Sequence, residues 1–185
     1  MISSNDLRNG MTVELDRALF TIVEFLHVKP GKGQAFVRTK LKNLITGQVL
    51  EKTFRAGEKM RRAHIETKNM QYLYPTGDMY VFMDNDNYEQ IEISKEVMGE
   101  ALKWLKDGAS MDVQFHEDRA IGVEPSAHMV LEITHTEPGF KGDTAQGGTK
   151  PATVETGATI NVPLFVEPGQ KILVDTRNGE YLKRA

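Results

Sequence analysis

Residues 19–33 read Leu-Phe-Thr-Ile-Val-Glu-Phe-Leu-His-Val-Lys-Pro-Gly-Lys-Gly, a strand-like segment followed by a turn. Apolar and polar side chains nearly alternate in this segment and again in residues 34–44, and β-branched and aromatic residues are frequent, which is the pattern of β-strands. Between the two segments, Gly31 and Gly33 can take positive φ, the backbone conformation that a tight reversal requires. The stretch therefore predicts a hairpin with Lys32 projecting from its tip.

The second strand of this hairpin is predicted to separate its side chains onto two different faces. One face carries Ala35, Val37, Thr39 and Leu41, and the other carries Phe36, Arg38, Lys40 and Lys42. Residues 25–50 contain five basic residues and no acidic residue. The five basic residues are Lys29, Lys32, Arg38, Lys40 and Lys42. Such a surface suits the phosphate backbone of nucleic acid, although exposed lysines often serve only solubility. An exposed lysine at a tip is also a group that an enzyme can modify.

Short strand-like segments and turns continue from this hairpin to the end of the chain. The pattern predicts strands at 19–29, 34–44, 48–55, 63–66, 71–74, 79–83, 111–116, 120–124, 128–136, 153–154, 159–165, 171–175 and 180–183. One helix is predicted over residues 95–106, with Ser94 as its N-cap and Asp107-Gly108 as its stop. Many short strands with a single helix predict an all-β chain of small barrels, in which two successive units of about 60 residues fit OB-folds.

The formal net charge of −3 conceals a strong segregation of charge along the chain. Residues 1–64 carry 12 Lys and Arg against 6 Asp and Glu, residues 65–128 carry 5 against 13, and residues 129–185 carry 6 against 7. These three ranges are the predicted domains. The contrast between the first two suggests that one end of the molecule meets a polyanion while the middle avoids it. Chance clustering of solvated charges is the alternative.

Composition also limits the compartment. The chain has no cysteine, which excludes disulfides, thiolate metal sites and cysteine nucleophiles and fits a reducing compartment. Residues 1–10 are polar, and no run approaches the roughly 18 apolar residues of a membrane span. We therefore expect a cytoplasmic protein that does not associate with membranes.

Familiar catalytic and metal-binding motifs fail in detail. Residues 84–95 resemble a calcium loop, but Glu89 stands at the sixth position, which needs glycine, and Lys95 at the twelfth, which needs glutamate. In residues 142–150 the lysine does not directly follow the second glycine, as a nucleotide-binding phosphate loop requires. The five histidines show no metal-ligand spacing. We therefore expect no metal, no cofactor and no enzymatic activity.

Three stretches resemble one known family. The first is Val-Lys-Pro-Gly-Lys-Gly-Gln-Ala-Phe-Val-Arg at 28–38, and the second combines Glu-Lys-Thr-Phe-Arg at 51–55 with Gln-Tyr-Leu-Tyr at 71–74. The third runs from Glu-Pro-Gly-Phe-Lys-Gly-Asp-Thr-Ala-Gln-Gly-Gly-Thr-Lys-Pro-Ala-Thr at 137–153 through Val-Pro-Leu-Phe at 162–165 to Val-Asp-Thr-Arg-Asn-Gly-Glu-Tyr at 174–181. In these motifs the chain resembles bacterial elongation factor P and its archaeal and eukaryotic relative that carries hypusine, over essentially its whole length.

The resemblance implies an SH3-like, KOW-type N-terminal barrel followed by two OB-folds. It implies a translation elongation factor that binds between the peptidyl-tRNA and exit sites of ribosomes stalled on consecutive prolines. The tip of the first domain would reach toward the acceptor end of the prolyl peptidyl-tRNA and favour a productive geometry, while ribosomal RNA does the chemistry. The implied partners are the ribosome, ribosomal RNA, peptidyl-tRNA and a lysine-modifying enzyme, and a monomer is expected.

The resemblance also implies roles for particular residues. Lys32 would be the modified residue, in a tip loop formed with Pro30, Gly31 and Gly33. Family members carry a β-lysyl extension or a shorter aminoalcohol on lysine, or rhamnose on arginine; Pro30 resembles the subset with the aminoalcohol. The predicted RNA-binding residues combine basic residues of the hairpin with positions in the C-terminal part. They are Lys29, Arg38, Lys40, Lys42, Gly142, Asp143, Thr144, Tyr181 and Arg184.

Two other classes of function stay open from the residues. A general single-stranded RNA-binding protein would need aromatic stacking platforms and a basic groove in its OB-folds, and the acidic residues 65–128 argue against it. A small β-rich enzyme would need a convergent polar pocket that no motif indicates.

Overall fold

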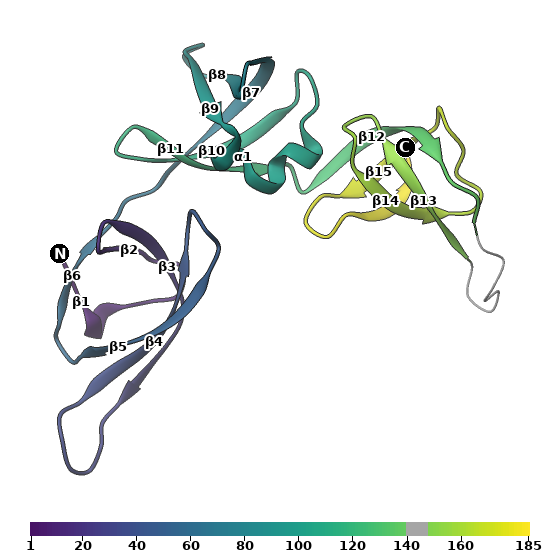
Figure 1. Ribbon diagram of the computed structural model, residues 1–185. Coiled ribbons are helices and arrows are strands. Elements are labelled where there is room, and N and C mark those ends of the chain that lie inside the picture. Colours follow the sequence, from purple (N-terminus) through teal and green to yellow (C-terminus); the bar gives the residue numbers. More distant parts are fainter. Residues whose placement is uncertain (140–147) are drawn as a thin grey trace. The chain divides into compact units, whose positions relative to one another are not determined.

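The computed structural model describes residues 1–139 and 148–185 and consists mostly of β-strands (Figure 1). The strands form three sheets, and the predicted all-β fold with a short helix is confirmed. The chain divides into two compact units. The first unit comprises Met1–Thr67 and Gln114–Gly122, and the second comprises Lys68–Val113 and Val123–Ala185.

The first sheet is formed by the N-terminal third of the chain. Its strands are β1 (Ile2–Ser3), β2 (Thr12–Leu15), β3 (Ala18–Val28), β4 (Phe36–Asn43), β5 (Val49–Arg55) and β6 (Lys59–Arg62), in the order β1-β6-β2-β3-β4-β5. A short 3₁₀ helix, η1 (Ser4–Asp6), follows β1. The side chains of Leu7, Val13, Ile22, Leu41 and Phe54 belong to its core. This core fixes the base of the β3–β4 hairpin, because both strands contribute to it.

The prediction of a strand at residues 63–66 was wrong. The basic cluster just before it forms β6 instead, and Arg62 of β6 lies opposite Val13 of β2. Met60 is the buried side chain of β6, while Lys59, Arg61 and Arg62 are exposed. One apolar residue among three cations gives too weak an alternation to indicate a strand. The sequence pattern also missed β1 and β2, which are short.

The second sheet is formed by β7 (Glu66–Thr76), β8 (Met79–Asp84), β9 (Gln90–Ser94), β10 (Ser110–His116) and β11 (Arg119–Pro125), in the order β11-β10-β7-β8-β9. The turn between β7 and β8 is tighter than predicted, because Thr76 and Met79 already pair and only Gly77 and Asp78 lie between them. Gly77 has a φ of +58°, as a two-residue hairpin turn requires.

The helix predicted over residues 95–106 is only partly present. Ser94 is the N-cap, and its Oγ accepts a hydrogen bond from the backbone N–H of Val97. The α-helix α1 (Lys95–Met98) then ends at Gly99, whose φ of +50° and ψ of −131° do not fit a right-handed helix. A 3₁₀ helix, η2 (Gly99–Trp104), follows.

The third sheet is formed by β12 (His128–Thr136), β13 (Thr149–Val154), β14 (Thr159–Pro163), β15 (Lys171–Asp175) and β16 (Glu180–Arg184), in the order β14-β13-β12-β15-β16. The two outermost strands, β14 and β16, also lie in contact, so the sheet curls toward a closed barrel. Leu131, Ile133, Val154, Val162 and Ile172 are buried inside it.

Candidate functional site

The β3–β4 hairpin carries Lys32 at its free end. Val28 and Phe36 are the last paired residues of the two strands, and residues 29–35 form the loop between them. Lys32 is exposed, as are Lys29, Pro30, Gly31 and Gly33. Of the two glycines that the sequence offered for a reversal, Gly33 takes a positive φ, +117°, and Gly31 does not. The reversal therefore depends on one glycine, in a loop longer than a two-residue turn.

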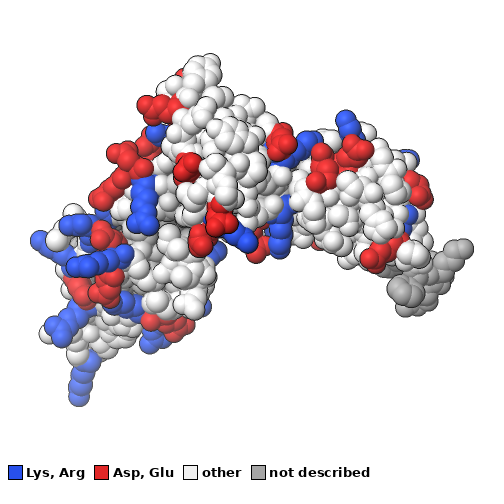
Figure 2. Space-filling view, turned by 45° about the horizontal axis from the view of Figure 1, so that its top comes forward, with Lys and Arg blue, Asp and Glu red and all other residues white. Residues whose placement is uncertain are grey.

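The strand behind the tip has the two faces that the sequence predicted. Val37, Thr39 and Leu41 are buried, and the Thr39 hydroxyl donates a hydrogen bond to the backbone oxygen of Lys52 at 2.7 Å. On the other face the cations Arg38, Lys40 and Lys42 are exposed. Figure 2 shows Lys and Arg side chains clustered over the first sheet, with carboxylates among them. The basic face is therefore accessible to a polyanion but is not purely cationic.

Lys40 differs from its two basic neighbours because it is paired. Its ammonium lies 2.9 Å from a Glu24 carboxylate oxygen, and Glu24 and Glu51 flank it on the adjoining strands. The hydrogen bond and charge of Glu24 raise the pKa of Lys40. Among residues 1–139 and 148–185, neither Arg38 nor Lys42 forms an ion pair. The face thus offers two uncompensated cations at positions i and i+4 of one strand.

The predicted RNA-binding residues of the C-terminal part lie in the second unit. Tyr181 is half-buried on β16 opposite Val174, and Arg184 is exposed near the end of the same strand. The guanidinium carbon of Arg184 lies 5.1 Å from the ring centre of Phe165, which is 56% exposed. Gly142, Asp143 and Thr144 lie outside the described residues. The sequence placed Phe165 at the end of a predicted strand and within the Val-Pro-Leu-Phe stretch of the resemblance, without giving it a role. In the structure β14 ends at Pro163, so Phe165 lies in the turn that follows.

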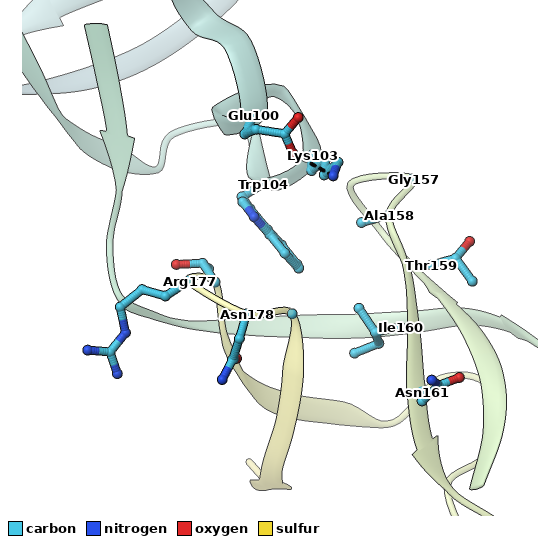
Figure 3. Close-up of a pocket in the computed structure, with 12 residues that line it drawn as sticks. Glu100, Lys103, Trp104, Gly157, Ala158, Thr159, Ile160, Asn161, Arg177 and Asn178 are labelled. Carbon is cyan, nitrogen blue, oxygen red and sulfur yellow. Dashed lines mark ion pairs between the residues drawn. The ribbon is translucent and has the colours of Figure 1, made fainter. Parts of the chain in front are cut away.

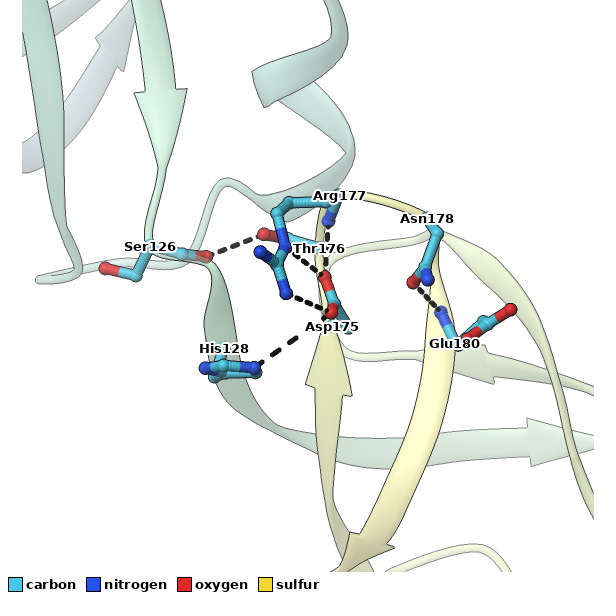
Figure 4. A network of polar contacts seen from close by, with 7 residues as sticks. All are labelled: Ser126, His128, Asp175, Thr176, Arg177, Asn178 and Glu180. Carbon is cyan, nitrogen blue, oxygen red and sulfur yellow. Dashed lines mark hydrogen bonds and ion pairs between the residues drawn. The ribbon is translucent and has the colours of Figure 1, made fainter.

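The turn between β15 and β16 is held by a fork of hydrogen bonds (Figure 4). Arg177 Nε and Nη2 donate to the two carboxylate oxygens of Asp175 at 3.0 and 2.7 Å, and the backbone N–H of Arg177 donates to Oδ1 at 3.0 Å. These contacts lower the pKa of Asp175 to about 2. Next to the fork, the Thr176 hydroxyl donates to the backbone oxygen of Ser126 at 2.6 Å. The resembling motif at 174–181 therefore has a structural role in this turn.

A hollow of about 680 Å³ lies in the second unit between η2 and the third sheet (Figure 3). Trp104 forms one wall, and a Cβ placed on Gly179 would lie 3.9 Å from its ring. The rest of the lining comes from Glu100, Lys103, residues 157–161 and residues 176–178. Glu100 and Lys103 pair with each other. Polar and apolar side chains share its lining, which holds no nucleophile with an adjacent base.

Beside this hollow, Lys106 joins the helical segment to the third sheet. Its ammonium lies 3.0 Å from a carboxylate oxygen of Glu155 and donates to the backbone oxygen of Val130 at 3.3 Å. Burial alone would raise the pKa of Glu155, but hydrogen bonds from the Glu132 backbone and from Lys106 lower it overall. The Thr156 hydroxyl adds a hydrogen bond to the backbone oxygen of Lys103. These contacts are polar and short, and they fix the helical segment on the barrel.

Other kinds of site are absent from the described part of the chain. No group of three or more His, Cys, Asp or Glu residues within residues 1–139 and 148–185 could hold a metal ion. Over the same residues no helix is long and apolar enough to cross a membrane. The hairpin tip with its basic face in the first unit, and the Arg184 region in the second, are therefore the candidate functional surfaces.

Three domain models of one family match successive parts of the chain. The model described as the elongation factor P (EF-P) KOW-like domain matches residues 3–60, the elongation factor P (EF-P) OB domain matches 65–123, and the elongation factor P C-terminal domain matches 129–184. Together these matches cover most of the chain.

Curated relatives named elongation factor P match over their full length. The chain is 56% identical over 184 residues to the relative from Acetivibrio thermocellus, with 100% of both chains covered. It is 55% identical to the relative from Coprothermobacter proteolyticus, with 100% of this chain and 99% of the relative covered. Identity to the relative from Moorella thermoacetica is 56% over 185 residues, again with 100% of both covered.

Solved structures of related factors match about two thirds of the chain. A eukaryotic translation initiation factor 5A from Methanococcus jannaschii is 27% identical with a TM-score of 0.51, covering 65% of this chain and 86% of that one. A translation initiation factor of the same family from Naegleria fowleri is 16% identical with a TM-score of 0.53, covering 66% of this chain and 96% of that one. Because its sequence identity is low, the second match supports a similarity of fold alone.

Proposed function

The chain belongs to the elongation factor P family, and from that membership we propose that it binds the ribosome between the peptidyl-tRNA and exit sites and promotes peptide-bond formation at consecutive-proline stalls. The single observation that carries the proposal is the exposed Lys32 at the end of a two-stranded arm whose base is fixed in the core of the first sheet. An arm of this kind can present one chemical group at a distance from the body of the factor.

The proposed mechanism is an effect of orientation. Proline is a poor substrate in peptide transfer when its geometry is unfavourable, and holding two reactants in a productive arrangement lowers the barrier by removing the entropy cost of reaching it. Lys32 would contact the acceptor end of the prolyl peptidyl-tRNA, and ribosomal RNA would carry out the bond formation. The factor is then a cofactor of a catalyst, and no side chain of its own needs to exchange a proton with the substrate.

The basic face behind the tip supports RNA as the partner. Arg38 and Lys42 are exposed and carry no carboxylate partner among the described residues, so their charges are available for phosphates. Lys29 is exposed next to the tip loop. Ribosomal RNA and the peptidyl-tRNA are the proposed polyanions, and the cytoplasm, where they occur, is the proposed compartment.

We also propose that a lysine-modifying enzyme acts on Lys32. The tip residues Pro30, Gly31 and Gly33 are exposed with Lys32, so an enzyme can surround the ammonium without opening the fold. A short aminoalcohol on the lysine is the proposed form of the modification. Mass analysis of residues 30–38 from protein made in its own host tests this part separately.

The test of the function is translation in vitro of a reporter that contains three consecutive proline codons. Reactions run without the chain, with the chain, with Lys32→Ala, and with Gln34→Ala as a control at an exposed, uncharged position of the same loop. We expect the parent chain and Gln34→Ala to relieve the stall and Lys32→Ala to fail, with a proline-free reporter unaffected in all four reactions.

Each other outcome contradicts a defined part of the proposal. If protein purified from its own host does not relieve the stall, the elongation-factor role proposed for this chain is wrong. If Lys32→Ala relieves the stall as well as the parent does, the role stands but the tip residue is not its centre.

A further inference from the structure

We propose that Phe165 and Arg184 of the second unit form a stacking platform for one unpaired nucleobase of the ribosome-bound RNA. This inference rests on the proposed function, because it names the chemical contact that the second unit makes in that complex. The guanidinium of Arg184 lies over one side of the Phe165 ring, 5.1 Å from its centre. Aromatic rings and guanidinium planes are the groups on which proteins stack splayed RNA bases.

Phe165 is displayed by a rigid turn. The next residue, Val166, is fully buried in the core of the third sheet, and its backbone N–H donates to the oxygen of Pro163 at 3.1 Å. The end of the turn is held by the N–H of Gly169, which donates to the oxygen of Ile133 at 2.8 Å. Because the backbone on both sides is fixed, little freedom of this turn is left for binding to remove.

Phe165 is among the large apolar side chains that the fold leaves exposed, and among those described it differs from the others in lying beneath a guanidinium. The apolar surface that Phe165 leaves in water gives up hydrophobic stabilisation that burial would provide. Its neighbour in sequence, Leu164, is half-buried, and Val166 is fully buried, so the fold had apolar positions available on both sides. A large exposed aromatic residue held in one place is typical of a contact residue.

The charges around the ring favour RNA over a protein partner. Arg184, whose guanidinium lies over the ring, is exposed and forms no ion pair among the described residues, so its charge is available for a phosphate. The one carboxylate in the Phe165 turn, Glu167, lies 3.6 Å from the ammonium of Lys150 and is thereby compensated. Cations beside an exposed ring provide for a phosphate and its base together.

A photo-crosslinking experiment identifies what covers the ring. The photoreactive amino acid benzoyl-phenylalanine replaces Phe165 in the full chain, which is then irradiated on ribosomes stalled at consecutive prolines and on ribosomes without tRNA. We expect a crosslink to an RNA nucleotide, and its sequence together with the tRNA-free arm distinguishes ribosomal RNA from tRNA. Crosslinks to ribosomal proteins alone, or none on ribosomes that bind the chain, would overturn the proposal.

Affinity measurements test stacking itself. Because base stacking on an aromatic side chain contributes about 1–3 kcal/mol, we expect Phe165→Leu to weaken ribosome binding by about 5- to 150-fold and Phe165→Tyr to retain it. Tyr88→Leu is the matched control, because Tyr88 is 70% exposed in the acidic part of the chain and its loss should change affinity less than about 2-fold. Equal affinity of Phe165→Leu and the parent would contradict the inference.

The salt dependence separates stacking from charge. Arg184→Gln should reduce the slope of log affinity against log salt by about 0.7–0.9, whereas Phe165→Leu should lower affinity without changing the slope. If the parent chain relieves the stall and Phe165→Leu binds ribosomes as tightly as the parent does, the stacking platform is refuted and the proposed function stands. If the parent chain does not bind ribosomes, both the stacking platform and the proposed function are refuted.

Discussion

At the scale of single residues, the basic face of β4 contains two kinds of cation. Lys40 is held by Glu24 at 2.9 Å, and Arg38 and Lys42 form no ion pair among the described residues. A compensated lysine releases few counterions when it meets a phosphate, because its charge is already neutralised. The three side chains therefore differ in how much free positive charge they offer to a phosphate, although they occupy equivalent alternating positions in the sequence.

This inequality predicts different salt dependences. Arg38→Gln and Lys42→Gln should each weaken ribosome binding and reduce its salt slope by about 0.7–0.9, while Lys40→Gln should change the slope by less than half of that. Ribosome-binding titrations over a range of salt concentrations measure the three slopes. If all three variants lose the same slope, or if binding does not depend on salt, the electrostatic account of this face is wrong.

A second residue-scale prediction concerns the acid limb of stability. The pKa of Asp175 is lowered from 3.8 to about 2 by the Arg177 fork, so the ionised form stabilises the folded state. That contribution is complete above the unfolded pKa and is lost as pH falls through the folded one, between about pH 5 and pH 2. We expect Asp175→Asn to be less stable than the parent at pH 7 and the difference to vanish near pH 2.

Urea unfolding followed by circular dichroism at a series of pH values checks this expectation. Parallel stability curves for parent and Asp175→Asn across the acid range would contradict it. Asp78→Asn provides the control, because Asp78 is exposed in the β7–β8 turn and forms no side-chain hydrogen bond or ion pair among the described residues, so the shape of the curve should stay unchanged.

Alternation along β4 could be predicted from the sequence, but the partner of Lys40 could not. The pairing of β3 with β4 shifts by one residue between Ile22 and Glu24, where a β-bulge inserts Val23. Without that bulge Val23 would stand opposite Lys40, and with it Glu24 does. A bulge has no reliable sequence signature, so the charge state of this face depends on a detail that only the structure gives.

At the scale of elements, Gly99 decides the form of the helical segment. Its φ of +50° and ψ of −131° are accessible essentially to glycine alone, and a Cβ there would meet no atom within 4 Å. Gly99→Ala should therefore destabilise the fold by about 1–3 kcal/mol through the backbone. Gly31→Ala, at a position without positive φ and also open, should cost less than about 0.5 kcal/mol, measured by urea unfolding. Equal costs would contradict the strain argument.

The two tip glycines make a second matched pair. Gly33 has a φ of +117°, and Gly31 lies one residue before Lys32 without positive φ. An alanine at 33 forces the loop into another conformation and redirects Lys32, whereas an alanine at 31 can keep the loop as it is. We expect Gly33→Ala to reduce stall relief several-fold while Gly31→Ala retains it, in the proline-codon translation assay. Equal activity would show that the loop conformation does not matter.

The sequence indicated a helical segment in the right place, but only Lys95–Met98 is an α-helix and Gly99–Trp104 is a 3₁₀ helix. The buried residues are Met98, Ala101 and Trp104, which are spaced three apart, as in a 3₁₀ helix with three residues per turn. In the predicted α-helix, Val97, Ala101, Trp104 and Leu105 lie on or near one face. Ala101 and Trp104 are buried, whereas Val97 and Leu105 are only half-buried. The glycine at 99 was the available signal that one α-helix could not continue.

At the scale of the whole molecule, Lys106 is the polar link between the helical segment and the third sheet inside the second unit. Its ammonium pairs with the Glu155 carboxylate and donates a hydrogen bond to the backbone oxygen of Val130. Lys106→Met keeps the aliphatic stem and removes both contacts, so we expect a loss of stability below about 1 kcal/mol but above that of Lys103→Met. Lys103 pairs only with the highly exposed Glu100. Calorimetric melting compares the two, and the reverse order would contradict the link.

The predicted boundaries at residues 64 and 128 follow modules of strands and turns and agree with the segregation of charge, whereas the compact units follow spatial contacts. Residues 114–122 belong with the first unit, where Ile121 packs against Leu19 and Ala63. Contacts between residues so far apart in the chain leave no local pattern in the sequence. The succession of short strands could be predicted approximately from the sequence, but the packing of residues 114–122 with the first unit could not. The three-domain division remains a prediction.

Trp104 is the single tryptophan of the chain, and it lies 6% exposed where η2 meets the Gly179 turn. The molecule thus carries one natural fluorophore at one known junction. Its emission reports whether water reaches that junction, and nothing in the other elements emits at the same wavelength. Loosening of the helical segment from the barrel can therefore be watched by light, without labelling and without altering either candidate surface.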